Sequence, residues 1–274
     1  MPRTYTANSY RYPNEQIVLG ITVLLVLLVI LLTATATVCL SFVFVLGSLI
    51  FGYFISRSHH QALLVQANQV NQHNAPELVP ALEQAKVRLQ VEPVQVFIVP
   101  QKSLNAYTFG MGSSKAIVLH SALFQIMDRD ELQFILGHEL GHVDLGHTWL
   151  NTLIGGMAGI PSHVGAATIL ELAFRSWNRA CEYSADRAGV LACNNPKKAI
   201  TALIKLEAGN DARTQAGLLR AIQRIETQDD DLFSNLSEVL ATHPMIIKRI
   251  EQIRAFAASN NYQHLQSLMN QNLG

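Results

Sequence analysis

The feature that most constrains this fold is a run of 39 residues, from Ile17 to Ile55, that contains no charged side chain. A single helix of that length would be roughly 58 Å long, about twice the thickness of a bilayer's hydrocarbon core. The run is also longer than the apolar segment of a secretory signal peptide. The sequence therefore predicts a transmembrane helical hairpin with a tight turn near Thr33–Thr37; the alternatives are a single tilted helix and a buried hairpin of a soluble protein.

Positive charges flank this run on both sides. Arg3 and Arg11 precede it and Arg57 follows it, whereas the predicted turn carries no charge. Lys and Arg are enriched in the loops that stay on the cytoplasmic side of a membrane. We therefore expect an integral protein of the cell's inner or plasma membrane. Both ends of the run and the remaining chain would be cytoplasmic, and the lipid bilayer would be one partner.

The composition excludes some other partners and sites. The 20 Lys and Arg residues balance the 20 Asp and Glu residues, and no basic cluster is present, so nucleic-acid binding is not expected. The three cysteines, Cys39, Cys181 and Cys193, are too few and too far apart for a disulfide framework or a cysteine-type zinc site. They fit a reducing compartment.

The chain divides by composition into five parts. These are an N-terminal cytoplasmic segment (1–16), the transmembrane hairpin (17–55), a connector rich in Gln, Asn and His (56–80), a main domain (81–258) and a Gln/Asn-rich tail (259–274). We expect the tail to be a frayed helix or disordered.

Short strands and helices are predicted in the main domain. Ala81–Leu89 is a plausible helix, and the β-branched runs VQVFIV (94–99) and KAIVLH (115–120) are predicted strands. A Gly/Ser turn signal before the second run suggests a small antiparallel sheet. Either strand could offer an exposed edge that binds an extended peptide.

The second half of the domain is predicted to be helical. The uncharged stretch Thr148–Leu170 is broken by glycines and is expected to pack against the domain or the membrane surface. From Ile169 onward the pattern is helical. Breaks are predicted near Asn194–Pro196, Gly209–Asn210 and His243–Pro244.

The sequence HELGH, residues 138–142, lies on a helix with a clear start signal. Asp128 is followed three residues later by Glu131, which is a capping-box pattern. Apolar residues then recur at helical spacing, and Gly155–Gly156 ends the pattern.

The two histidines of HELGH are spaced for metal binding. On a helix, His138 and His142 lie about 40° apart, so both imidazoles can reach one ion. Glu139 lies beside them, close enough to contact a zinc-bound water. A catalytic zinc site needs a third protein ligand and one open position.

One candidate for the third ligand is His147. Some zinc peptidases continue the motif as H-E-x-x-H-x-x-G-x-x-H, but this chain has Leu145 and Thr148 at the last two specified positions. Gly146 and His147 each lie one position away from where this longer motif requires a glycine and a histidine. On a regular helix His147 would lie about 140° from His142 and could not reach the same ion. A surface or supporting histidine is the alternative interpretation.

The other candidate is Glu182, in the sequence NRACEYSAD. Glu182 and Asp186 are four residues apart on a predicted helix and would project toward one partner. One carboxylate could ligate the metal while the second orients a ligating histidine. A solvated helix face with ion pairs to Arg179 and Arg187 is the alternative.

Taken together, these motifs resemble a known family. Paired N-terminal spans, NAYTFG, HELGHVDLGH, EYSAD and THPMIIKR are similar to those of integral-membrane zinc endopeptidases. That group includes the HtpX-type quality-control proteases and the CAAX prenyl proteases, and its third zinc ligand is a glutamate. The resemblance covers about residues 80–255. The sequence departs from the larger members in lacking convincing later spans, so an intramembrane chamber and a prenylated substrate have no support.

The resemblance implies a fold and a set of residue roles. The fold is α+β and mainly α-helical, with the N-terminal transmembrane hairpin followed by a zincin-like metallopeptidase domain. The implied roles are His138, His142 and Glu182 as ligands of one Zn²⁺ per chain, Glu139 as general base and acid, Asn105 in contact with the substrate or the developing oxyanion, His243 in transition-state stabilisation, and Arg249 in bracing the site.

We therefore expect a membrane-anchored zinc endopeptidase that acts on membrane or misfolded proteins in membrane protein quality control. A catalytically silent, zinc-stabilised binding or chaperone module tethered to the membrane is the second hypothesis. A metal-independent helical adaptor is the third. The presence of Glu139 favours catalysis, because a structural zinc site closes its fourth position and needs no base.

Overall fold

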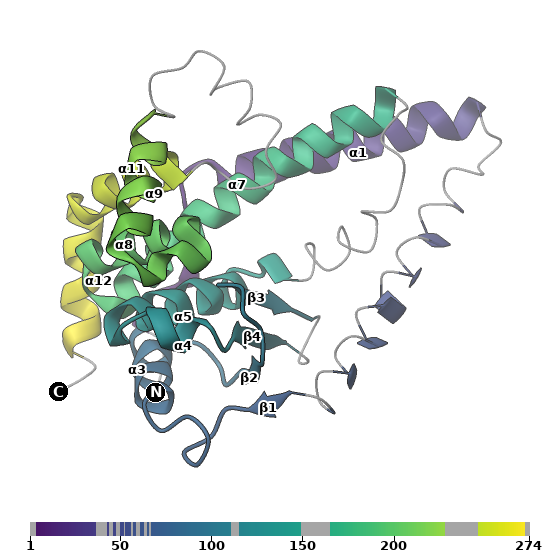
Figure 1. The fold of residues 1–274 in the computed structure, drawn as a ribbon. Coiled ribbons are helices and arrows are strands. Elements are labelled where there is room, and N and C mark those ends of the chain that lie inside the picture. The colour runs from purple at the N-terminus through teal and green to yellow at the C-terminus, as the bar shows by residue number, and fades with distance from the viewer. Residues whose placement is uncertain are drawn as a thin grey trace.

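The computed structural model describes residues 4–36, 67–110, 115–148, 165–227 and 246–271, and part of the stretch 37–66. Helices dominate these residues, with one small sheet (Figure 1), which confirms the mainly helical α+β prediction. In chain order the elements are η1 (Ala7–Ser9), α1 (Glu15–Ala36), β1 (Asn68–Gln69), α3 (Leu78–Leu89), β2 (Gln95–Val99), β3 (Ala106–Phe109), β4 (Ala116–His120), α4 (Leu123–Ile126), α5 (Arg129–Asp144), α7 (Gly165–Cys193), α8 (Pro196–Ala208), η2 (Gly209–Arg213), α9 (Gln215–Thr227), α11 (Ile246–Ala257) and α12 (Asn260–Gln271).

Helix α5, which carries HELGH, lies at the centre of the fold. It contacts α3, α7, α8 and β3, and every side chain position from Gln133 to Val143 is buried. A helix buried on all sides holds its polar groups in fixed surroundings. The two histidines therefore face protein atoms rather than bulk water.

The predicted capping box begins α5. The Asp128 side chain accepts a hydrogen bond from Glu131 N over 3.0 Å, and the Glu131 side chain accepts one from Asp128 N over 2.8 Å. Lys205 Nζ of α8 lies 2.6 Å from Glu131 Oε2 and ties the helix start to its neighbour. The helix ends at Asp144, well before the stop predicted at Gly155–Gly156.

Helices α5 and α7 approach each other closely because small residues line their contact. A Cβ atom built on Gly141 would lie 2.6 Å from the Cβ of Ala188 and 3.2 Å from the Cα of Ala185. Such distances leave no room for a side chain at Gly141. The close approach brings the carboxylates of α7 within reach of the histidines of α5.

The sheet is mixed, with strand order β1-β2-β4-β3. Strands β2 and β4 confirm the two predicted strands, but they pair in parallel, so the antiparallel prediction is wrong. The reason is β3, which the sequence pattern did not reveal. The chain reverses direction between β2 and β3 and again between β3 and β4, so β2 and β4 point the same way. Strand β3 pairs antiparallel with β4 on the far side.

The strand order also shows that the expectation of an exposed, peptide-binding edge on either predicted strand is wrong. Strands β2 and β4 are each paired on both sides, so neither offers an edge. Strand β4 is buried on both faces: Ile117 and Leu119 join the main core, while Ala116 and Val118 pack with Phe97. Among the described strands, β3 is the edge beside α5.

Helices α1 and α7 run side by side and project together away from the other helices (Figure 1). Helix α1 continues through Ala36, so the turn does not begin at Thr33 as predicted. Much of the second predicted span, and most of the stretch 148–170, lie outside the described residues. Within the described part of the chain, no helix is both long and apolar enough to cross a membrane.

The C-terminal tail is a packed helix, so the expectation of a frayed or disordered tail is wrong. Helix α12 contacts α3, α7 and α11, and its Leu265 and Met269 are buried. Gln266 accepts a hydrogen bond from Arg88, a buried side chain of α3. The prediction was wrong because it rested on the many Gln and Asn residues of this segment and overlooked Leu265 and Met269, two apolar residues at helical spacing.

The remaining helix boundaries follow the sequence signals. Helix α8 begins after Asn195, whose side chain accepts a hydrogen bond from Lys198 N, with Pro196 in the first turn. Helix α8 ends at Ala208, next to the break predicted at Gly209–Asn210. The predicted helix Ala81–Leu89 is α3, which begins earlier, at Leu78. The predicted break at His243–Pro244 lies outside the described residues.

Candidate metal centre

His138, His142 and Glu182 converge on one buried point. The Nε2 atoms of the two histidines of α5 are 3.2 Å apart. Glu182 on α7 lies across from them, with Oε2 3.5 Å from His138 Nε2 and Oε1 3.4 Å from His142 Nε2. Two imidazoles from one helix are thus brought together with a carboxylate that lies 40 positions beyond His142 in the chain.

The size of this group fits zinc. In a tetrahedral site with bonds of about 2.0–2.1 Å, neighbouring ligand atoms lie roughly 3.3–3.4 Å apart. The two histidine Nε2 atoms are 3.2 Å apart, and each lies 3.4–3.5 Å from one oxygen of the Glu182 carboxylate, which is close to that value. Two histidines and one glutamate are also a ligand set of catalytic zinc sites, which keep the fourth position open for water or substrate.

Asp186 lies behind the first histidine and does not face the central point. Its Oδ1 atom is 3.0 Å from His138 Nδ1, on the side of the ring opposite Nε2. Arg249 of α11 donates to both oxygens of Asp186, over 2.8 Å and 2.6 Å. The same guanidinium lies 3.5 Å from Glu182 Oε2. Arg249 therefore contacts both carboxylates that α7 contributes.

The electrostatics of the centre favour a cation. Burial opposes ionisation of Glu182, but His142 and Arg249 hold its pKa well below the ordinary value. Burial likewise opposes ionisation of Asp186, and Arg249 and His138 outweigh it and lower its pKa. With Glu139, the centre contains three carboxylates and one guanidinium. The two negative charges left over are what a divalent cation would neutralise.

His142 shows the same preference for positive charge. Burial opposes its protonation, but the hydrogen bond and charge of Glu182 outweigh burial and raise its pKa. A metal ion bound at Nε2 would supply that positive charge in place of a proton.

Glu139 is buried and held by the edge strand of the sheet. Thr108 Oγ1 on β3 donates a hydrogen bond to Glu139 Oε2 over 2.8 Å. Because β3 contacts α5 directly, the strand sets the orientation of this carboxylate beside the three donor atoms. A carboxylate fixed next to a metal position can accept a proton from a water molecule there.

His147 is buried beside the centre and is not a surface residue. Gly146 has a φ of +78°, which turns the chain after the end of α5. The turn places His147 Nδ1 2.9 Å from His142 Nδ1. Burial lowers the pKa of His147 to about 4 although Glu15 opposes the shift, so its ring is neutral at neutral pH.

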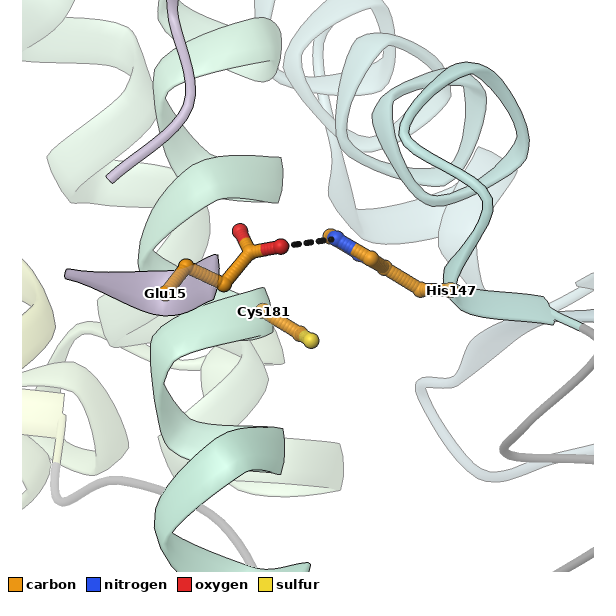
Figure 2. Close-up of side chains that lie close together, drawn as sticks. All are labelled: Glu15, His147 and Cys181. Carbon is orange, nitrogen blue, oxygen red and sulfur yellow. Dashed lines mark hydrogen bonds and ion pairs between the residues drawn. The ribbon is translucent and has the colours of Figure 1, made fainter. Parts of the chain in front are cut away.

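The other ring nitrogen of His147 faces Glu15, the first residue of α1. His147 Nε2 lies 3.1 Å from Glu15 Oε1, and Figure 2 shows the two side chains pointing at each other with Cys181 beside them. Ligand atoms of these three residues lie within 4.8 Å of one another. His147 thus contacts His142 from behind and lies outside the group formed by His138, His142 and Glu182.

The remaining predicted residues lie apart from this cluster or outside the described chain. Asn105 is exposed immediately before β3, and its backbone oxygen accepts a hydrogen bond from His120 N over 3.0 Å. His243 lies outside the described residues, so its role stays a prediction. Cys181 and Cys193 are free and buried.

Sequence reasoning missed three residues of this centre: Thr108, Glu15 and Ser184. Thr108 could have been noticed only through its place in the motif NAYTFG. The only signal for Glu15 is that a carboxylate stands two positions before a long uncharged run. Ser184 lies within EYSAD between the two carboxylates. It donates to Glu15 and accepts from Tyr12 N, and no local pattern reveals these contacts with the N-terminal segment.

Comparisons with known proteins identify relatives over most of the chain. The model of peptidase family M48 matches residues 71–257, which include every described residue of the centre except those of the N-terminal segment. The chain is 28% identical over 235 residues to the "Plastoglobule-localized metallopeptidase 48, chloroplastic" of Arabidopsis thaliana, covering 80% of this chain and 67% of that protein.

Microbial relatives give a similar result. A "Protease HtpX homolog" of Pyrococcus abyssi is 26% identical over 234 residues, covering 70% of this chain and 77% of the relative. A protein of the same name from Streptococcus thermophilus is 27% identical over 232 residues, covering 69% and 76%.

Proposed function

Because the chain belongs to the HtpX-type metallopeptidases of peptidase family M48, we propose that it is a membrane-anchored endopeptidase that hydrolyses peptide bonds with one zinc ion. His138, His142 and Glu182 are the proposed ligands. The observation that carries this proposal is the donor group itself. Its spacing matches tetrahedral zinc, and its surroundings hold two negative charges in excess.

The residues around the donor group have distinct proposed tasks. Zinc held there would lower the pKa of a water molecule and polarise the carbonyl of the peptide bond. Glu139 would accept a proton from the attacking water and deliver it to the leaving amine. Thr108 would keep the Glu139 carboxylate aimed at that water. Asp186, braced by Arg249, would fix the ring of His138.

The substrate is proposed to bind along β3. Its outer edge pairs with no other described strand, and an extended peptide could add to it by main-chain hydrogen bonds. The strand passes Glu139 at Thr108, so a peptide on that edge would run beside the donor group. Asn105, exposed at the start of β3, is placed to contact such a peptide or its developing oxyanion. His243 is proposed to stabilise the transition state.

Membrane anchoring is proposed for residues 17–55. Large apolar side chains of α1 that would normally be buried are exposed: Ile17, Ile21, Val23, Leu24, Leu27, Leu28, Leu31 and Leu32. An exposed apolar surface of this extent is unfavourable in water and favourable against lipid. Membrane proteins and misfolded proteins near the bilayer are the proposed substrates, in a quality-control role.

The arrangement of the N-terminal segment supports an even number of membrane crossings. Tyr10 donates a hydrogen bond to Asp144, and Tyr12 N donates one to Ser184 Oγ over 2.7 Å. Residues before the uncharged run therefore pack on the same domain as residues after it. The two ends of the run must then lie on one side of the membrane, proposed to be the cytoplasmic side from the flanking arginines.

A catalytically silent, zinc-stabilised binding or chaperone module is the second candidate. A structural zinc site uses four protein ligands and needs no base. Within the described residues, the donor group has three members, with the carboxylate of Glu139 buried beside it. This arrangement favours catalysis.

The test is digestion of casein by the purified full chain, with and without a zinc chelator. Wild type should cleave casein, lose activity in chelator and regain it with added zinc. Glu139→Gln should bind zinc as wild type does and lose cleavage by orders of magnitude, because an amide cannot accept the proton. The matched control is Glu83→Gln, an exposed carboxylate of α3. Activity of Glu139→Gln equal to that of the control would exclude Glu139 as the base.

A further inference from the structure

We infer that Glu15 and His147 are positioning residues of the metal centre: they orient His142 and fix its tautomer, so that the first turn of α1 forms part of the site. The inference rests on the proposed function, because it assumes that His142 binds a metal through Nε2. It adds two residues with no assigned role. One of them, Glu15, lies outside the region 71–257 that the family model matches.

The geometry forms one continuous chain of contacts. His142 Nδ1 is 2.9 Å from His147 Nδ1, and His147 Nε2 is 3.1 Å from Glu15 Oε1. Both rings and the carboxylate are buried, with exposed fractions of 6%, 1% and 1%. Figure 2 shows the last link of this chain, with His147 aimed at the Glu15 carboxylate. His147 thus links His142 of the donor group to Glu15 at the start of α1.

Metal binding at Nε2 determines where the protons lie. The ligand ring of His142 then carries its hydrogen on Nδ1 and donates it to His147 Nδ1. His147 must accept at Nδ1, so its own hydrogen is on Nε2 and is donated to Glu15 Oε1. A neutral imidazole with one acceptor and one donor is the group that can link these two partners. The protonated form of His147 could not accept the first bond.

Glu15 is held in place for this task. Arg11 donates to its Oε1 atom and Ser184 donates to its Oε2 atom. Burial opposes ionisation of Glu15, but His147, Ser184 and Arg11 outweigh burial and hold its pKa below the ordinary value. Arg11 Nη2 also donates to Leu145 O over 3.1 Å, which fixes the arginine against the turn that carries His147.

The two ligand histidines are thus supported in parallel ways. His138 has the carboxylate of Asp186 directly behind Nδ1. His142 has the carboxylate of Glu15 behind its Nδ1, with His147 as the bridge. A carboxylate behind a ligating histidine fixes the ring and raises its basicity. Glu15 belongs to α1, which packs on α7, and His147 connects its carboxylate to His142 on α5.

A second metal ion held by Glu15, His147 and Cys181 is the rival interpretation of the same cluster. Two observations count against it. Arg11 donates to Glu15 Oε1, the same oxygen that faces His147 Nε2, so this oxygen already has two donors. Burial raises the pKa of the Cys181 thiol, which disfavours the thiolate that a metal requires. Replacement of Cys181 separates the two interpretations.

The experiment measures zinc affinity by chelator competition, and the absorption spectrum after replacement of zinc with Co²⁺, in the full chain. His147→Phe keeps a ring of similar size but has no nitrogen atoms. It should weaken zinc binding by about 10- to 100-fold, which is typical of losing such a partner, and should change the Co²⁺ spectrum. His147→Gln, whose amide can both accept and donate, should recover part of the loss. A purely structural role would lower the melting temperature without changing the spectrum of the bound Co²⁺.

Cys181→Ala is the matched control, since it lies in the same cluster but outside the proposed chain of contacts. It should bind one zinc with wild-type affinity. Two metal ions in wild type and one in Cys181→Ala would overturn the inference in favour of a second metal site. Wild-type affinity and spectrum in His147→Phe would also overturn it.

Two further variants keep the test decisive. If His147→Phe does not fold, Glu15→Gln replaces it: the amide oxygen still accepts from His147 but carries no charge, so a smaller loss of affinity is expected. Unchanged affinity in Glu15→Gln would overturn the inference.

His142→Ala tests separately the premise that His142 is a zinc ligand. If it retains stoichiometric zinc, the proposed ligand set is wrong and the inference fails with it, whereas failure of the His147 variants alone leaves the proposed function intact.

Discussion

Thr108 Oγ1 donates a hydrogen bond to Glu139 Oε2 over 2.8 Å, which joins the edge strand of the sheet to the carboxylate next to the donor group. Thr108 and Glu139 are 31 positions apart in the chain. The hydroxyl has a fixed donor position because it belongs to β3, whose other edge is paired with β4. If Glu139 is the general base, Thr108 determines where its proton-accepting oxygens point.

Replacement of Thr108 with Val should lower kcat/KM for casein and leave zinc content unchanged. A hydrogen bond to a charged group is worth about 1.5–3 kcal/mol, so the loss could reach roughly tenfold to hundredfold in rate. Val has the same shape, and Thr108→Ser, which keeps the hydroxyl, is the control. Equal activity of the Val and Ser variants would show that this hydrogen bond does not orient the base.

Gly141→Ala should weaken both folding and zinc binding. The added Cβ would lie 2.6 Å from the Cβ of Ala188, so α7 must move away from α5 and carry Glu182 with it. Overpacking of this kind typically costs about 1–3 kcal/mol. The measurements are thermal unfolding and zinc affinity. Gly20→Ala in α1 is the control, because nothing lies within 4 Å of a Cβ built there. A Gly141 variant as stable as this control would contradict the tight contact.

Loss of a proposed ligand should weaken zinc binding more than loss of His147, the residue proposed to support His142. His142→Ala and Glu182→Ala should each purify without stoichiometric zinc, because two protein ligands hold the ion weakly. His147→Phe should still bind one zinc at saturating concentration, with lower affinity. Metal content measured after dialysis distinguishes these cases. Zinc retained by His142→Ala but lost from the His147 variant would reverse the assignment of ligand and supporting residue.

The N-terminus of α5 should make stability depend on pH through Asp128. Partial burial opposes its ionisation, but hydrogen bonds from Lys198 and Glu131 N outweigh burial and lower its pKa. A lowered pKa stabilises the fold above the ordinary pKa of the carboxyl, and the contribution is lost as the pH falls through the folded value. Asp128→Asn keeps a cap acceptor and loses the charge, so its deficit in melting temperature should shrink as the pH falls below about 4.

Asp128→Ala provides the second arm of this test. It removes the cap itself and should cost about 0.5–2 kcal/mol at neutral pH, more than the Asn variant. Thermal unfolding is followed in chelator, so that loss of metal in acid does not contribute. A constant difference between wild type and Asp128→Asn across this pH range would show that the charge of Asp128 does not stabilise α5.

Features that depend on neighbouring residues could be predicted from the sequence. The start of α5 was predictable because Asp128 and Glu131 satisfy each other's backbone donors three residues apart. The convergence of His138 and His142 is likewise a local consequence of helix geometry. That Glu182 and Asp186 share one face of a helix needed only a spacing of four, whereas the prediction that this face meets HELGH came from the family resemblance.

Features that depend on distant contacts could not be predicted. Strand β3 is short, and only its pairing with β4 makes it a strand, which is why the sheet's direction was predicted wrongly. His147 was predicted to be a surface or supporting histidine that could not reach the ion of His142, on the assumption of a regular helix. The positive φ of Gly146 breaks that assumption. Its partner Glu15 lies 132 positions away, and no local pattern could join them.

The last prediction concerns the crossing of residues 17–55 through the membrane. The segment before this run packs on the main domain, since Tyr10 contacts Asp144 and Tyr12 N contacts Ser184. If the run crosses a membrane, its two ends therefore lie on one side, and a run of 39 uncharged residues is long enough for two spans but too long for one. A reporter fused after Leu89 should then behave as cytoplasmic.

A reporter inserted at Ala36, the last residue of α1, should behave as exported. The two fusions control each other, because both carry the same reporter in the same membrane. An exported Leu89 fusion would mean a single span, and the domain could then not contact residues 10–12 as it does. A cytoplasmic Ala36 fusion would mean that the run does not cross the bilayer. The apolar side chains exposed on α1 would then need another cover, such as a partner protein.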